Sequence, residues 1–236
     1  MIDQQRRKLL GAGSILAGIS MLTLSTDVRG AKQSLSADNS RKAESEIIAD
    51  NMQLNLNEVQ FLFADLQPEL VKTSITNPPE KLAGNAESLA KVASVLKLPM
   101  LFLTVANGDV IPELKPYANA QNTLFRTNAD PFLVPGIVNA LEKNKRKTLI
   151  VAGYTTEVAV LLSVLGAVRH GYRVHVAVDC IGSRSARTET AALLQANQAG
   201  AVQTSVLTVA AQLAPEFSQE PGKTILSVLY EVMSRK

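Results

Sequence analysis

The chain has 236 residues, 46% of them hydrophobic, which is enough to bury the core of one ordinary domain and leave residues for an extension. Aromatic residues make up only 4% and tryptophan is absent, so the core must be aliphatic, which favours α/β layers over a carbohydrate-binding or base-stacking surface. The formal charge of +3 falls to +1 once the first thirty residues are set aside, and a nearly neutral body argues against a nucleic-acid-binding protein.

The first thirty residues resemble an export signal. A charged start is followed by an apolar run from Leu9 to Leu24, and small residues come after it. The pair Arg6-Arg7 is typical of twin-arginine signals, although the flanking Gln5 and Gly11 are not. The run is short for a membrane span and contains glycines. We therefore expect residues 1–30 to direct twin-arginine export to the periplasm, with cleavage after Gly30. An ordinary secretory signal and an uncleaved inner-membrane anchor are the alternatives.

Residues 31–57 are polar and without sustained apolar periodicity, so they are predicted to be a linker with one short helix at most. The domain is expected over 58–236. From there, strand-length apolar runs alternate with helical patterns. Strands are predicted at 59–64, 100–105, 123–125, 148–152, 173–178 and 202–205. Helices are predicted near 79–96, 131–144, 156–170 and 187–199, with further helices at the C-terminus.

Nearly continuous apolar strands, each followed by a helix, indicate a mostly parallel sheet covered on both faces. The predicted fold is therefore a three-layer α/β/α sandwich. In such sheets the site lies beyond the carboxyl ends of the strands. Asp65 follows the first strand, Gln67 comes two residues later, and Arg126 ends the third strand. Asp65 is a candidate site residue, or else a cap for the next segment.

The stretch from Gly153 to Glu157 ends the fourth strand and opens a helix. Backbone N–H groups in a first helical turn can bind an anion, so Tyr154, Thr155 and Thr156, together with Gln67, are the candidate ligand-binding residues. A threonine acting as a simple helix N-cap is the alternative.

Other polar residues give weaker signals. Asp179 is expected to end the fifth strand beside Cys180, the only cysteine, which is expected to be buried as a small hydrophobe. His170 and His175 do not form a metal-ligand set, so neither a metal nor a cofactor is expected. The basic run 143–147 precedes a strand and is interpreted as a solvated loop.

The ordered motifs resemble the isochorismatase-like cysteine hydrolase superfamily, in its branch of uncertain substrate. They are the stretches 63–67, 110–114, 126–129, 149–158, 171–179 and 198–201, and the resemblance covers about residues 59–213. Active members of that superfamily use an Asp, a basic residue and a nucleophilic Cys. The resemblance places the Asp at Asp65 and the basic residue at Arg126, and it implies a cis peptide bond between Tyr154 and Thr155. The cysteine position falls on Ala159.

An alanine methyl group can neither ionise nor form a covalent intermediate, so the family mechanism cannot run at position 159. We therefore expect an exported pseudoenzyme that binds a small carbonyl or carboxylate compound, with the export machinery as a transient partner and homo-oligomers implied by the resemblance. The alternative is an active hydrolase of an amide, imide or vinyl-ether bond that uses Asp65 with water. Thr155, Thr156 or Cys180 as a replacement nucleophile is the least supported option.

Overall fold

The computed structural model describes residues 52–235 and, before them, residues 42, 45, 46, 49 and 50. The predicted export signal and most of the predicted linker lie outside these residues. One compact unit spans Ile48–Lys236. No helix in the described part of the chain has the length and hydropathy needed to cross a membrane.

The centre of the domain is a sheet of six parallel strands in the order β3-β2-β1-β4-β5-β6. Their bounds are β1 Val59–Ala64, β2 Met100–Thr104, β3 Thr123–Phe125, β4 Thr148–Tyr154, β5 Arg173–Gly182 and β6 Val202–Thr204. Strand order reverses between β1 and β4, because β2 and β3 continue on one side of β1 and the later strands on the other. The predicted parallel sheet is confirmed.

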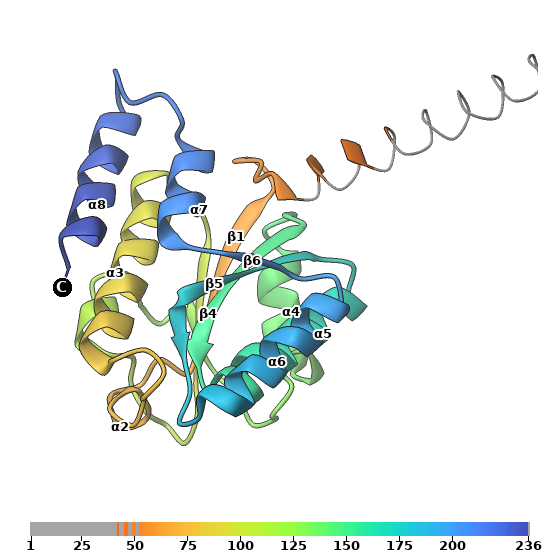
Figure 1. Ribbon diagram of the computed structural model, residues 1–236. Coiled ribbons are helices and arrows are strands. Elements are labelled where there is room, and N and C mark those ends of the chain that lie inside the picture. Colours follow the sequence, from red (N-terminus) through yellow and green to blue (C-terminus); the bar gives the residue numbers. More distant parts are fainter. Residues whose placement is uncertain (1–41, 43–44, 47–48, 51, 236) are drawn as a thin grey trace, which may run out of the picture. The chain divides into compact units, whose positions relative to one another are not determined.

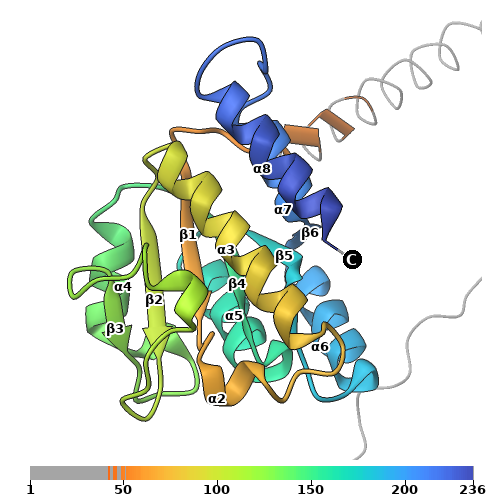
Figure 2. The ribbon, with the colours of Figure 1, turned by 90° about the vertical axis from the view of Figure 1, so that its left-hand side faces the viewer.

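Helices cover both faces of the sheet, as Figures 1 and 2 show. One layer contains α2 (Pro68–Val71), α3 (Pro79–Val95), α7 (Val206–Leu213) and α8 (Gly222–Ser234). The other contains α4 (Pro135–Glu142), α5 (Leu161–Arg169) and α6 (Ala186–Gln198). Short helical turns lie at η1 (Pro112–Leu114), η2 (Pro131–Leu133) and η3 (Thr156–Val160). The predicted three-layer sandwich is therefore confirmed.

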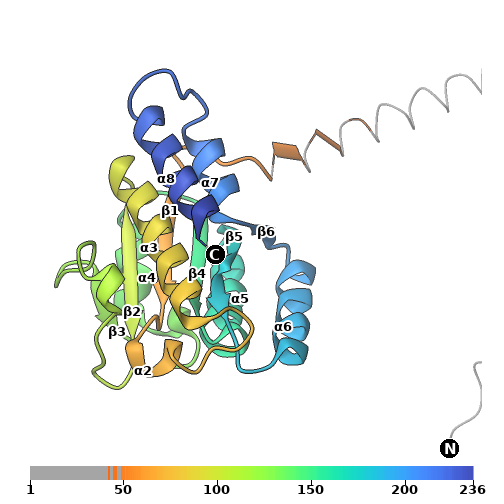
Figure 3. The same cartoon turned by 60° about the vertical axis from the view of Figure 1, so that its left-hand side comes forward.

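Alternation of side chains along the strands produces two cores. In β1, Phe61 and Phe63 pack under α3, whereas Leu62 packs under α4 and α5. A third cluster joins α8 to α3 and α7 through Ile225 and Val228, and Figure 3 shows α8 lying over these two helices. All the β1 side chains are buried, which explains why this strand is apolar at every position except Gln60.

The structure differs from the sequence prediction in two helices. The segment predicted as one helix over 131–144 is divided into η2 and α4, because Pro135 lacks an N–H and occupies the first position of the second helix. The segment predicted as a helix over 156–170 begins with the π-helical turn η3 before α5.

The fifth strand was also predicted too short. Asp179 and Cys180 do not end β5, which continues to Gly182 after an irregularity in its pairing with β4 between Val151 and Gly153. This irregularity carries β5 past the polar Asp179, which periodicity alone treats as the end of a strand.

Candidate active site

The carboxyl ends of β1 and β4 meet at the centre of the sheet. Ala64, the last residue of β1, is in register with Gly153 of β4. Asp65 follows β1, and η3, which contains Ala159, follows β4. The closeness of the two strands leaves no room for a side chain on Gly153, because a Cβ there would come 2.5 Å from the carbonyl oxygen of Ala64. The parallel sheet thus brings two predicted site segments together.

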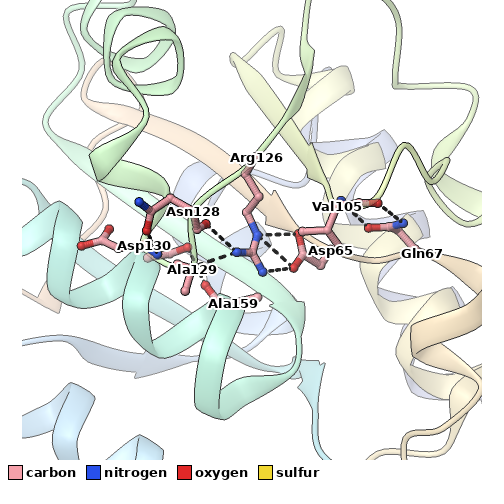
Figure 4. Close-up of polar contacts among 9 residues, drawn as sticks. Asp65, Gln67, Val105, Arg126, Asn128, Ala129, Asp130 and Ala159 are labelled. Carbon is pink, nitrogen blue, oxygen red and sulfur yellow. Dashed lines mark hydrogen bonds and ion pairs between the residues drawn. The ribbon is translucent and has the colours of Figure 1, made fainter.

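Asp65 and Arg126 form a buried ion pair at this edge (Figure 4). Nε of Arg126 donates to Oδ1 and Oδ2 of Asp65 at 2.9 and 3.0 Å, and Nη2 also donates to Oδ2. The two residues are only 2% and 8% exposed. Asp65 does not cap α2, whose N-cap is Gln67. The carboxylate instead points toward the third strand, and the geometry is the forked pairing that a guanidinium favours.

The remaining donors of Arg126 are directed to the backbone. Nη1 donates to the carbonyl oxygens of Asn128 and Ala129 at 2.7 and 3.3 Å. This leaves the guanidinium with most of its five N–H groups already used within the chain. Arg126 therefore holds Asp65 and the loop after β3 more than it offers a fork to a ligand.

Burial raises the pKa of the Asp65 carboxyl, and the hydrogen bonds and positive charge of Arg126 lower it, with burial the larger effect. A carboxyl with a raised pKa at the carboxyl edge of a parallel sheet is a typical candidate for acid–base chemistry. Here both of its oxygens accept hydrogen bonds from Arg126, so a proton-transfer role would require the pair to open.

Ala159 lies in η3, at the turn beside the ion pair in Figure 4, and is 1% exposed. The peptide bond between Tyr154 and Thr155 is cis, as the family resemblance implies. The Thr155 carbonyl oxygen accepts hydrogen bonds from the N–H groups of Val158 and Val160, both at 3.2 Å. The strand, the cis bond and the helical turn are therefore all in place around a residue whose side chain is a methyl group.

Gln67 is committed to the loop after β2. Its Oε1 accepts from the N–H of Val105 at 2.7 Å, and its Nε2 donates to the Val105 carbonyl oxygen at 3.1 Å. Ala106 and Asn107 follow in left-handed conformation, and a Cβ on Gly108 would overlap the Gln67 amide. Gln67 thus holds this loop beside the site, and both polar atoms of its amide are already hydrogen-bonded.

The structure separates the other three candidate ligand-binding residues. Tyr154 is fully buried in the core under α3, and its hydroxyl group is 2.7 Å from that of Thr73. The Thr156 hydroxyl donates to the carbonyl oxygen of Gly182 at 3.0 Å and to Glu189 at 2.9 Å. Thr155 occupies the N-cap of η3 without a side-chain capping bond and remains partly exposed. Of the four candidates, Thr155 is the one best placed to contact a ligand.

A network of hydroxyl groups and two carboxylates supports η3, and sequence reasoning missed it. Glu157 accepts from the hydroxyls of Ser183 and Thr188, while Glu189 accepts from those of Thr76 and Thr156. Burial raises the pKa of Glu157, but these hydrogen bonds outweigh it and the net shift is downward. Glu189 lies on α6, far from η3 in sequence, so no local pattern could have indicated the contact.

Cys180 and the histidines lie away from this site. Cys180 is fully buried, as expected, and burial together with the neighbouring Asp179 raises the pKa of its thiol well above the usual range. The carboxylate of Asp179 accepts from the N–H of Val206, at the start of α7. His170 ends α5. Within the described residues, no three His, Cys, Asp or Glu side chains come together as metal ligands.

Asp65 after β1, Arg126 after β3 and the strand–turn–helix after β4 converge at the carboxyl edge of the sheet, where open α/β sheets bind their small-molecule ligands. A family model described as the isochorismatase domain matches residues 59–207. The chain belongs to the isochorismatase family.

Among curated proteins, the chain is similar to "Probable hydrolase YcaC" of Escherichia coli, with 30% identity over 160 residues that cover 64% of this chain and 74% of that protein. Among solved structures, it resembles YcaC from Pseudomonas aeruginosa with hexane-2,5-diol and covalent acrylamide. The TM-score is 0.71 at 27% identity, covering 77% of this chain and 94% of that one. It also resembles YcaC of E. coli, described as an octameric hydrolase of unknown specificity, with a TM-score of 0.72 at 28% identity and coverage of 77% and 90%.

Removing either partner of the Asp65–Arg126 ion pair alone should destabilise the domain. Asp65→Ala and Arg126→Met should each lower the free energy of unfolding by roughly 3–5 kcal/mol, because each leaves one buried charge without its partner. The double variant should lose clearly less than the sum of the two single losses. Urea unfolding followed by circular dichroism measures all four proteins. Additive losses would contradict the tight coupling.

Proposed function

We propose that the chain is an exported isochorismatase-family protein that binds a small carbonyl or carboxylate compound and does not carry out the cysteine chemistry of its family. The observation that carries this proposal is the methyl group of Ala159, buried in the turn next to the Asp65–Arg126 pair. Covalent catalysis needs an ionisable or hydroxyl-bearing nucleophile at that point, and alanine has none.

The contacts of neighbouring side chains support a site without a substitute nucleophile. The hydroxyl of Thr156 is directed to Glu189 and Gly182, and the thiol of Cys180 is buried with a raised pKa. The P. aeruginosa relative was solved with a covalent acrylamide. The methyl group of Ala159 can contact such a molecule but cannot form a covalent bond with it.

An active hydrolase that uses Asp65 with water is the second candidate. The upward shift of the Asp65 pKa favours it, since a carboxyl of raised pKa is better matched to proton transfer near neutral pH. Its substrates would be amides, imides or vinyl ethers. The forked contact with Arg126 argues against it, because both carboxylate oxygens would have to leave that contact to serve as a base.

Restoring a thiol tests the proposed site. The Ala159→Cys variant should react with an alkylating probe such as iodoacetamide, and its thiol pKa should fall below the ordinary value of about 8.5, because Arg126 and the first helical turn favour a thiolate. Val158→Cys is the matched control: its neighbouring position is 42% exposed and should give a thiol of ordinary pKa. Cys180 is buried and should stay silent in both proteins.

A thiol of ordinary reactivity at position 159 would contradict the placement of Arg126 in the site. Turnover by the unaltered chain on a panel of amides, imides and isochorismate-like ethers, lost in Asp65→Ala, would instead favour the active hydrolase. Because that variant is also expected to be less stable, the assay must be run where circular dichroism shows that it is folded.

We also propose that residues 1–30 direct the folded protein through the twin-arginine pathway to the periplasm. Replacing both Arg6 and Arg7 with lysine keeps the charge but removes the guanidinium pair that this pathway reads, so export should be lost. Arg41→Lys, in the linker, is the control and should leave export unchanged. Cell fractionation measures both. Export of the double variant would contradict the twin-arginine route, and an intact N-terminus in the membrane fraction would indicate an uncleaved anchor.

We further propose that the protein is a homo-oligomer, as its E. coli relative is described to be an octamer. Helix α8 buries Ile225 and Val228 within its own domain but leaves Tyr230 and Met233 61% and 56% exposed. Large apolar side chains grouped on one helix are typical of contact surfaces. Light scattering on the mature chain should give a mass that is a multiple of the mass of one protomer, and Tyr230→Glu together with Met233→Glu should lower it. A monomeric mass at all concentrations would contradict the proposal.

A further inference from the structure

One carboxylate joins the segments that follow three neighbouring strands, β1, β4 and β5. Glu189 lies in the first turn of α6, which follows β5, and its Oε2 accepts hydrogen bonds from two hydroxyl groups. Thr156, the first residue of η3 after β4, donates at 2.9 Å, and Thr76, between α2 and α3 after β1, also donates at 2.9 Å. Glu189 is therefore the point at which three segments of the carboxyl edge meet.

The start of η3 is not fixed by its own sequence. Thr155 occupies its N-cap position without a side-chain capping bond. The turn is π-helical, with the N–H of Val160 donating to the Thr155 carbonyl oxygen at 3.2 Å, and such turns are rare in proteins. Because neither a cap nor a regular α-helical hydrogen-bond pattern fixes this turn, its geometry depends on contacts with other elements. Helix α6 packs directly against it.

Thr156 connects η3 to α6 in the interior of the domain. The residue is 1% exposed, and its hydroxyl has two acceptors, Oε2 of Glu189 at 2.9 Å and the carbonyl oxygen of Gly182 at 3.0 Å. A hydroxyl group has one hydrogen to donate, and a charged acceptor forms the stronger hydrogen bond. Glu189 is therefore the stronger of the two anchors for the first residue of η3.

The second partner of the carboxylate is held against the segment after β5. The Thr76 hydroxyl accepts from the N–H of Ser183 at 2.8 Å, and the N–H groups of Ile75 and Thr76 donate to the Ser183 carbonyl oxygen at 2.9 and 3.2 Å. A hydroxyl that accepts from Ser183 while it donates to Glu189 has a fixed orientation. Glu189 is thereby held in place by a contact outside η3, so the turn can be fixed against it.

The residues of the candidate site lie on either side of this anchor. Thr155 precedes Thr156, and Ala159 follows it within the same turn. We infer that Glu189 is a positioning residue for the candidate site, which sets the place of Thr155 and Ala159 through the Thr156 hydroxyl. The inference rests on the proposed function, because it takes the turn at Ala159 as the ligand site. Glu189 lies outside the stretches that carry the family resemblance.

A thiol placed at position 159 tests this role. In Ala159→Cys alone, Arg126 and the first helical turn are expected to lower the thiol pKa. Adding Glu189→Ala should raise that pKa toward the ordinary value of about 8.5 and lower the thiolate fraction at neutral pH roughly tenfold. The loss of a negative charge would by itself lower the thiol pKa, so a rise identifies displaced geometry. The pH dependence of the rate of alkylation by iodoacetamide measures the pKa.

Four further variants, all in the Ala159→Cys background, separate position from charge and from stability. Glu189→Gln removes the charge but keeps an amide oxygen that can accept from the two threonine hydroxyls, so the thiol pKa should stay low. Thr156→Val removes the hydroxyl from the other side of the contact and should reproduce the rise. Glu80→Ala removes a carboxylate from the first turn of α3 that has no hydrogen-bond or ion-pair partner among the described residues, and it should leave the pKa unchanged. Ile225→Ala, in the cluster between α8 and α3, lowers stability and should also leave the pKa unchanged.

A thiol pKa that falls or stays unchanged on adding Glu189→Ala would overturn the inference, because Glu189 would then act through its charge or not at all. Equal rises with Glu189→Ala and Ile225→Ala would overturn it too, because any loss of stability would then suffice. An ordinary thiol in Ala159→Cys alone would instead contradict the proposed function.

Hydrogen exchange decides the inference independently of the thiol. The N–H groups of Val158 and Val160 donate to the Thr155 carbonyl oxygen, and their exchange is slow only while η3 keeps its geometry. In the chain with Ala159 unchanged, Glu189→Ala should speed exchange at these two amides, and Glu189→Gln should not. Unchanged exchange in Glu189→Ala would overturn the inference.

Discussion

The parallel pairing of β1 with β4 is the constraint on which the rest of the domain depends. It brings the ends of two strands, distant in sequence, to one point and places Ala64 against Gly153 so closely that no side chain fits between them. Everything polar at the centre of the carboxyl edge follows from this contact. Asp65 leaves β1 there, η3 begins one turn beyond Gly153, and Arg126 reaches across from β3.

The Asp65–Arg126 pair gives the site its character. In a site that still worked through a cysteine, a cation would serve the nucleophile as well as the carboxylate. Here the guanidinium binds Asp65 with two of its nitrogens and the backbone at Asn128 and Ala129 with the third. A group satisfied in this way can persist without a reaction to serve, because it holds the loop after β3 on the end of β1. Under the proposal that the chain lacks the nucleophile of its family, this is a physical reason for the scaffold to persist.

The two edges of the sheet differ in their polar contacts. At the carboxyl edge lie the Asp65–Arg126 ion pair, the hydrogen bonds between Gln67 and Val105, and the hydroxyl network around Glu157 and Glu189. All of these contacts give rigidity around a small site. At the amino edge, Gln60 donates to the carbonyl oxygen of Arg146, and Arg146 donates to those of Leu56 and Val59, so the turn before β4 is held on β1.

The sequence pattern alone was sufficient for the fold class, the order of the strands along the chain and the placement of Asp65 and Arg126 at strand ends, whereas Ala159 was singled out by the family resemblance. Buried parallel strands produce unbroken apolar runs, and the residues at their ends stand out as the first polar positions. Other features were decided only by tertiary structure. Tyr154, Gln67 and Thr156 looked like ligand contacts, yet their polar atoms are taken up by Thr73, Val105 and Glu189. Those partners lie tens of residues away, and no local pattern records which of several hydrogen-bonding groups will face one another once the layers pack.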